Sequence, residues 1–256
     1  MQPRAGLFVS CLVDLFRPSV GFAAARLIEA SGCRVVVPER QTCCGQPAYN
    51  SGDRATALDL ALQTIRAFSV CDYVAVPSGS CAAMLKTEYP RLFSEAQPEL
   101  RQEAEAFAAK VYEICTFLAD VRELNFLPGR YDGTVTYHDA CTGLRELGVK
   151  SAPRRLLERV PGLQLTEMHE PETCCGFGGL FSEKYAGISN AIVTRKIDDA
   201  ARTKAPLVLA GDLGCLMNMS GKATRDGRPI TFRHVLEILA GELSDPPIGH
   251  ARVLRP

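Results

Sequence analysis

The sequence has no excess of charge of either sign and no long apolar run. Its 256 residues include 29 Lys and Arg and 29 Asp and Glu, so the formal net charge is zero. A protein that tracks a phosphate backbone needs a basic excess, and the lack of one argues against nucleic-acid binding. No apolar run reaches the roughly 20 residues that span a bilayer. The apolar stretch 6–13 is closed by Asp14 and carries no cleavage pattern, so we expect a cytoplasmic protein without a transmembrane segment.

Cysteine, in contrast, is abundant. The chain has 11 cysteines, which is too few for a disulfide scaffold of this length and many for a cytoplasmic protein. Because reducing compartments do not sustain structural disulfides, this excess indicates metal ligation or thiol redox chemistry. The compact Cys-x₂₋₄-Cys knuckles of structural zinc sites are absent from the sequence.

Eight of the cysteines form two matched sets. In each set a first cysteine precedes a Thr-Cys-Cys-Gly segment, and a last cysteine follows it after an apolar run. The offset between the sets is 130 residues at the first cysteine, 131 at the pairs and 134 at the last cysteine. Such agreement indicates an internal duplication. The first set is Cys11, Cys43, Cys44 and Cys81, and the second is Cys141, Cys174, Cys175 and Cys215.

Each half of the chain alternates short apolar runs with amphipathic segments. Alternation of this kind favours parallel sheets that are covered by helices on both faces. We expect strands over 6–11, 33–37, 73–76, 134–137, 163–168 and 207–210. Helices are predicted over 18–31, 53–68, 99–120, 153–160, 183–203 and 231–239, with another that begins at 81.

The predicted fold class is therefore α/β, with two duplicated Rossmann-like lobes built on parallel sheets. The Cys-Cys-Gly loops are expected at the C-terminal ends of strands, where open α/β sheets bind their ligands. We place the first lobe at 1–126, the second lobe at 133–240 and a loose C-terminal tail at 241–256.

Four cysteines that are distant in sequence would converge at one sheet edge in each lobe. Four thiolates suit either a tetrahedral zinc ion or an iron–sulfur cluster. Adjacent cysteines converge poorly on a single ion, whereas in a cluster each sulfur can bind a different iron. We therefore favour two iron–sulfur clusters, each most simply [4Fe–4S], and keep zinc and a thiol–disulfide redox site as alternatives.

The two Cys-Cys-Gly segments, with their upstream and downstream cysteines, resemble the duplicated cysteine-rich CCG domain. That family includes the cysteine-rich subunit of heterodisulfide reductase, the glycolate oxidase iron–sulfur subunit and lactate utilization protein A. The resemblance covers about residues 5–240. The size of the chain, the lack of a ferredoxin-like Cys-x₂-Cys-x₂-Cys module and the segment Asp212-Leu-Gly-Cys-Leu-Met-Asn218 are most similar to the lactate utilization proteins.

One departure from the family pattern changes the expected chemistry. In the cysteine-rich subunit of heterodisulfide reductase each last cysteine belongs to a Cys-x-x-Cys, which gives five ligands and a non-cubane cluster. The first positions of those motifs are Ser78 and Asp212 in this chain. Four ligands per site favour an ordinary cubane, although either oxygen side chain could still act as a ligand.

Other residues near the motifs have simpler interpretations. Cys33, Cys71 and Cys115 fall outside both sets and are expected to be buried as small apolar side chains. His138 could donate a hydrogen bond to a cluster sulfur, or it could be an ordinary buried histidine at the end of a strand. The sequence identifies no catalytic residue.

The resemblance implies an iron–sulfur electron-transfer subunit of an L-lactate oxidation complex, which converts lactate to pyruvate. The eight cysteines of the two sets would hold its clusters. Because clusters carry single electrons and no hydride acceptor is visible, the chain would relay electrons within an oxidoreductase complex. Its partners would be other subunits of that complex, including a ferredoxin-like iron–sulfur protein. The alternatives are a heterodisulfide-reductase-like catalytic subunit and a non-redox interaction module stabilised by zinc.

Overall fold

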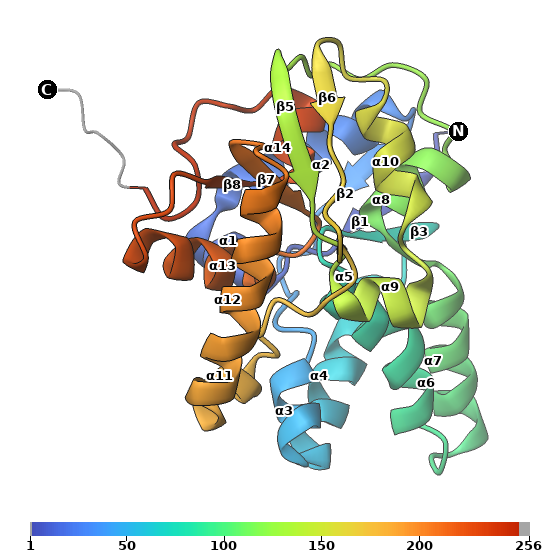
Figure 1. Cartoon of the computed structure of the whole chain (residues 1–256). Helices are drawn as coiled ribbons and strands as arrows, with labels where there is room; N and C mark the ends of the chain where they lie inside the picture. Colours follow the sequence, from blue (N-terminus) through green and yellow to red (C-terminus); the bar gives the residue numbers. More distant parts are fainter. Residues whose placement is uncertain (1, 251–256) are drawn as a thin grey trace, which may run out of the picture.

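The computed structural model describes residues 2–250 and contains two four-stranded parallel sheets (Figure 1). The strand order is β2-β1-β3-β4 in the first lobe and β6-β5-β7-β8 in the second. The order is the same when the strands of each lobe are counted from its start, which confirms the predicted α/β fold with duplicated lobes. The strands are β1 (Arg4–Leu7), β2 (Arg34–Val36), β3 (Tyr73–Val76), β4 (Val111–Glu113), β5 (Gly133–Tyr137), β6 (Leu163–Leu165), β7 (Leu207–Ala210) and β8 (Thr231–His234).

Helical segments join the successive parallel strands, as crossover connections require. None of the helices that the structure describes has the length and apolar character to cross a bilayer. In the first lobe they are α1 (Cys11–Phe16), α2 (Pro18–Ala30), α3 (Gln46–Ser51), α4 (Arg54–Ala67), α5 (Gly79–Ala83), α6 (Tyr89–Leu92), α7 (Pro98–Ala109) and α8 (Ile114–Thr116), with π-helical turns η1 (Met84–Glu88) and η2 (Phe117–Val121). In the second lobe they are α9 (Cys141–Leu147), α10 (Ser151–Leu157), α11 (Leu180–Lys184), α12 (Ala186–Arg202), α13 (Leu213–Arg225) and α14 (Val235–Ala240).

Two of the predicted helices were wrong in part, because each contains the fourth strand of its lobe. The range 99–120 holds α7, then β4, then α8 and most of η2. The range 231–239 begins with β8, which pairs with β7 in the register Val208↔Phe232. Neither strand is an apolar run like β3 or β7, and pairing with the neighbouring strand decides its conformation. The predicted strand 6–11 also ends early, since Cys11 opens α1.

The two lobes pack on each other through reciprocal contacts between equivalent helices. Helix α14 of the second lobe packs on α2 of the first, while α8 and η2 of the first lobe pack on α10 of the second. Helices α5 and α9 also lie side by side (Figure 1). The Cα of Gly143 lies 3.0 Å from where a side chain at Gly79 would begin, so these two helices touch through their backbones. Leu27 of α2 and Leu239 of α14 belong to one buried core, which is continuous across the lobe boundary.

A buried ion pair crosses the same boundary. The side chain of Glu237 in α14 is fully buried. Its carboxylate oxygen Oε1 accepts a hydrogen bond from Arg17 Nε at 2.9 Å and lies 2.7 Å from Arg17 Nη2. Ser19 Oγ donates to the same oxygen at 3.2 Å, and the backbone N–H of His234 donates to the other oxygen at 3.0 Å. Glu237 therefore ties the start of α2 to the start of α14.

His234 is a buried, uncharged histidine at this boundary. Its Nδ1 accepts from the backbone N–H of Leu236 at 3.3 Å and caps α14. Burial lowers the pKa of His234 to about 4, below the value of about 6.5 expected in the unfolded chain. As the pH falls, His234 is therefore protonated in the unfolded chain before it is protonated in the folded protein, which favours unfolding. The contribution of neutral His234 to stability is complete only above about pH 6.5.

We expect the His234→Asn variant to lose less stability on acidification than the parent protein. Between about pH 6.5 and 4 the parent should lose up to about 1.4 kcal/mol per pH unit through this residue. Asparagine can still cap the helix but does not titrate. Denaturant unfolding at pH 7, 6 and 5 measures both slopes, and equal slopes would show that His234 is not responsible.

The predicted loose tail is anchored in its described part. Ile248 is buried, and its backbone N–H donates to the carbonyl of Phe232 at 2.8 Å. The carbonyl of Ile248 accepts from Ser220 Oγ at 2.6 Å. Residues 251–256 of the predicted tail lie outside the described residues.

Candidate metal centre

The first set of cysteines converges at the C-terminal edge of the first sheet. Cys11 is the first residue of α1, and Cys81 lies in the first turn of α5. Cys43 and Cys44 come from the loop between β2 and α3. Thiol–thiol hydrogen bonds join Cys11 to Cys43, Cys43 to Cys44 and Cys44 to Cys81. Four cysteines spread over 71 positions of sequence thus form one continuous quartet.

The second set repeats this arrangement in the second lobe. Cys141 opens α9, Cys215 lies in the first turn of α13, and Cys174 and Cys175 occupy the loop between β6 and α11. Hydrogen bonds join Cys141 to Cys174, Cys174 to Cys175 and Cys175 to Cys215. All eleven cysteines of the chain lie in the described residues and are free thiols.

Both quartets face a single cavity between the lobes. Its volume is about 240 Å³, and it is lined by all eight cysteines together with Ser78, Ser80 and Asp212. In each quartet the second cysteine of the pair and the last cysteine are buried, whereas the other two are partly exposed. Each quartet therefore has a floor of two enclosed thiols and a rim of two accessible ones.

The glycine after each cysteine pair fixes the loop. Gly45 and Gly176 both have φ of +83°, a left-handed conformation that glycine adopts without strain. A side chain at Gly176 would begin 2.7 Å from the carbonyl of Ser189, so α12 could not pack there. The backbone N–H of Gly176 donates to Cys174 Sγ at 3.3 Å. This geometry explains why both pairs are followed by glycine.

The thiols of each quartet share their protons unevenly. Hydrogen bonds from Cys11 and Cys44 lower the pKa of Cys43 to about 2. The hydrogen bond with Cys43 in turn raises the pKa of Cys11. The pKa of Cys44 is raised by its hydrogen bonds with Cys43 and Cys81 and by burial. In the second quartet, the hydrogen bond with Cys174 raises the pKa of Cys141. Four thiolates at such a site need a compensating cation, and metal binding would release the remaining protons.

Ser78 and Asp212 contact each other across the lobe boundary. Asp212 Oδ2 accepts from Ser78 Oγ at 3.0 Å, from Ser80 N at 3.1 Å and from Ser80 Oγ at 2.7 Å. Asp212 Oδ1 caps α13 by accepting from Gly214 N at 3.1 Å, and Ser78 Oγ caps α5 by accepting from Cys81 N at 3.3 Å. Both carboxylate oxygens are thus occupied, Oδ2 by hydrogen bonds that join the lobes and Oδ1 by the cap of α13.

We expect the Asp212→Ala variant to be destabilised by about 2–4 kcal/mol. The substitution removes a helix cap and leaves the buried hydroxyl of Ser78 without its acceptor. The free energy of unfolding from denaturant titration measures the effect. Asp59→Ala, which truncates an exposed carboxylate on α4, is the matched control and should change stability by less than about 0.5 kcal/mol.

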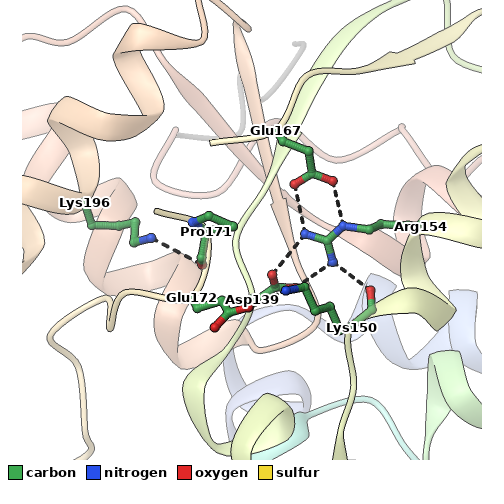
Figure 2. A network of polar contacts seen from close by, with 7 residues as sticks. All are labelled: Asp139, Lys150, Arg154, Glu167, Pro171, Glu172 and Lys196. Atoms are coloured by element: carbon green, nitrogen blue, oxygen red, sulfur yellow. Dashed lines mark hydrogen bonds and ion pairs between the residues drawn. The ribbon is translucent and has the colours of Figure 1, made fainter. Parts of the chain in front are cut away.

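A polar network lies behind the second quartet. His138 is fully buried, and its ring lies within 4.8 Å of the Sγ atoms of Cys175 and Cys215. Burial lowers the pKa of His138 to about 3, so the ring is neutral. The next residue, Asp139, receives a bidentate bond from the guanidinium of Arg154 at 2.8 and 2.9 Å (Figure 2). Lys196 of α12 is buried and donates to the carbonyls of Glu170 and Pro171.

The sequence-based predictions can be compared with this geometry residue by residue. Each cysteine set converges, and Cys33, Cys71 and Cys115 are buried elsewhere, as expected for small apolar side chains. The buried Lys196 was missed, because a lysine in an amphipathic helix is usually exposed. The contact between Ser78 and Asp212 was also missed, although their matched positions in the two halves could have suggested it.

The comparisons with known proteins agree with the duplication. The family model of the cysteine-rich CCG domain matches residues 5–86 and 135–220. Lactate utilization protein A of Geobacillus kaustophilus is 48% identical over 236 residues, which are 92% of this chain and 98% of that protein. The chain belongs to the lactate utilization protein A family.

Other members of the family have similar identity over the same length. The Geobacillus thermodenitrificans protein is 47% identical over 92% of this chain and 98% of its own length. The Exiguobacterium protein is 41% identical over 93% of this chain and 97% of its own length. A crystal structure of a hypothetical protein from Helicobacter pylori resembles the fold with a TM-score of 0.61 at 10% identity. The match covers 95% of this chain and 49% of that one.

Proposed function

We propose that the chain is the cytoplasmic iron–sulfur electron-transfer subunit of an L-lactate-oxidising system. One observation carries the proposal: two quartets of cysteine thiols line one cavity between duplicated lobes. The names of the curated relatives supply the link to lactate. Four thiols per site, with a neutral histidine behind one of them, fit a thiophilic group of several irons.

The protein residues have separate tasks at these sites. A bound iron–sulfur cluster would supply one-electron transfer. Cys11, Cys43, Cys44 and Cys81 would hold one [4Fe–4S] cluster, and Cys141, Cys174, Cys175 and Cys215 the other. The buried cysteines keep water from the floor of each site, while the partly exposed ones face the mouth of the cavity. An electron can therefore reach the sites from a protein that docks at that mouth, for which we propose a ferredoxin-like iron–sulfur partner.

Anaerobic purification followed by iron and sulfide analysis tests the cofactor. Two four-iron clusters require about eight iron atoms and about eight acid-labile sulfides per chain. Electron paramagnetic resonance of the reduced protein should show two cluster signals. Zinc without acid-labile sulfide would overturn the proposal and establish an interaction module stabilised by zinc.

Lactate-dependent dye reduction tests the role in lactate oxidation. The isolated chain should show no turnover, because it offers no hydride acceptor for the substrate. Activity should appear when the other subunits are added. Substantial turnover by the isolated chain would contradict the relay role, and inactivity of the complete mixture would contradict the assignment to lactate.

A further inference from the structure

The two cysteine quartets have different residues behind them. Phe8 and His138 occupy equivalent positions three residues before the first cysteine of each set. The backbone N–H of Phe8 donates to Ala75 at 3.0 Å, and that of His138 donates to Leu209 at 2.9 Å. Both acceptors lie in the third strand of their lobe, so the duplication superimposes a phenylalanine on a histidine.

The surroundings of Phe8 are apolar. Its ring is fully buried and lies 5.9 Å from the ring of Phe68, measured between centroids. Phe8, Ile65 of α4 and Phe68 belong to one buried apolar cluster. The hydroxyl of Tyr89, also buried, donates to the carbonyl of Cys44 and is thereby occupied. The side chains named at this site are thus aromatic or uncharged.

The surroundings of His138 are polar. Within residues 2–250 neither of its ring nitrogens has a hydrogen-bond partner, although the side chain is fully buried. A neutral imidazole always carries one N–H donor, and leaving it unpaired in the interior is costly. The sulfur atoms of Cys175 and Cys215 lie within 4.8 Å of the ring. The acceptors beside this ring are therefore the second quartet and the carbonyl of Pro171.

Lys196 adds a positive charge beside the same site. Its ammonium donates to the carbonyl of Glu170 at 2.5 Å and to that of Pro171 at 3.3 Å, the second of which Figure 2 shows. The nearby carboxylate of Asp199 accepts from the backbone N–H groups of His169 and Glu170. The carboxylate of Asp139 forms an ion pair with the guanidinium of Arg154. The carboxylates of Asp199, Asp139 and Glu170 and the thiol of Cys175 all lie near this ammonium, so the second quartet is among the groups on which its charge acts.

We propose that His138 donates a hydrogen bond to the second iron–sulfur cluster and, with Lys196 behind it, gives that cluster the higher reduction potential. The inference rests on the proposed function. Hydrogen bonds to cluster sulfur and nearby positive charge stabilise the reduced, more negative state. One electron from a reductant then resides on the second cluster, while the first stays oxidised until a second electron arrives. The residues of the second lobe thus set the direction of transfer across the cavity.

Potentiometric titration of the holoprotein with dithionite, followed by electron paramagnetic resonance, tests this order. The protein should show two midpoint potentials. The Cys44→Ala variant, which keeps only the second quartet intact, should retain the higher one. In that background His138→Phe reproduces the aromatic residue of the first lobe and should lower the midpoint. We expect at least a tenfold shift toward the oxidised state, about 59 mV for a one-electron couple.

Two further substitutions separate tuning from folding. His138→Gln restores an N–H donor and should recover much of the higher potential. Lys196→Gln keeps a donor for the two carbonyls but removes the charge, and should lower the same midpoint. His234→Asn is the control, because it changes a buried neutral histidine that is not grouped with the sulfur atoms of Cys175 and Cys215.

The outcomes are distinguishable. The inference would be overturned by equal midpoint potentials in the parent protein or by an unchanged midpoint potential in His138→Phe. If the iron and sulfide contents are normal in that case, the proposed function still stands. Loss of the second cluster in both His138 variants would also overturn it, since His138 would then be a ligand. A parent protein without iron would overturn both proposals.

Discussion

Replacing Cys175 with Ala is expected to remove about half of the bound iron and one of the two cluster signals. Cys175 lies in the middle of its quartet, where its thiol contacts those of Cys174 and Cys215. Its loss would leave one iron of the proposed cluster without its thiolate ligand. The opposite quartet belongs to the other lobe and should keep its cluster. Cys44→Ala should have the mirror-image effect.

Cys71→Ala is the matched control for these variants. Cys71 is equally enclosed, but it lies beside Gly6 and Lys110, away from the cavity. Its substitution should leave iron and sulfide contents unchanged. Iron and sulfide per chain, measured after anaerobic purification, distinguish the three variants. Equal iron in all of them would contradict the assignment of the two quartets.

Replacing Glu237 with Ala is expected to destabilise the protein by about 3–5 kcal/mol. The substitution leaves the buried guanidinium of Arg17 without its carboxylate and Ser19 without an acceptor. For a chain of this size that loss corresponds to a fall in Tm of roughly 6–20 °C. Thermal unfolding of the holoprotein measures it.

Two variants show whether the buried charge is the cause. The double variant Arg17→Leu with Glu237→Leu removes this pair and should recover part of the lost stability, because only Arg233, 3.8 Å from the same carboxylate, is then left without it. Asp198→Ala breaks an exposed pair with Arg228 and should cost at most about 1 kcal/mol. A fall in Tm that is the same for Glu237→Ala and Asp198→Ala would contradict a special role for the lobe boundary.

The repeated cysteine spacing is the reason that so much of the fold could be predicted. It revealed the duplication, and the duplication together with Gly45 and Gly176 located both loops at the sheet edges. The strands β4 and β8 could not be predicted in this way. Each contains a charged residue, unlike the apolar strands β3 and β7, and each forms by pairing with the neighbouring strand.

The contacts around the candidate site depend on distant residues, which sequence patterns do not specify. Ser78 and Asp212 stood out as departures from the family pattern, yet only the packing of the lobes shows that they bond to each other. Lys196 lies on the amphipathic helix α12, where a lysine is usually exposed, but it is buried and donates to two carbonyls of a loop in the same lobe. Periodicity reports which face of an element is apolar, and it carries no information on polar groups that are satisfied in the interior.

The reciprocal packing of α2 on α14 and of α10 on α8 and η2 has a consequence for how the cavity is assembled. Two separate copies of one lobe, related by a twofold axis, would make each of these contacts twice, as in an isologous dimer. Such a dimer would have a complete cavity only at concentrations high enough for association. In the fused chain the two halves are always present together at the high effective concentration that a short linker provides. The chain therefore keeps its two cysteine quartets facing each other at any dilution, like a homodimer that cannot dissociate.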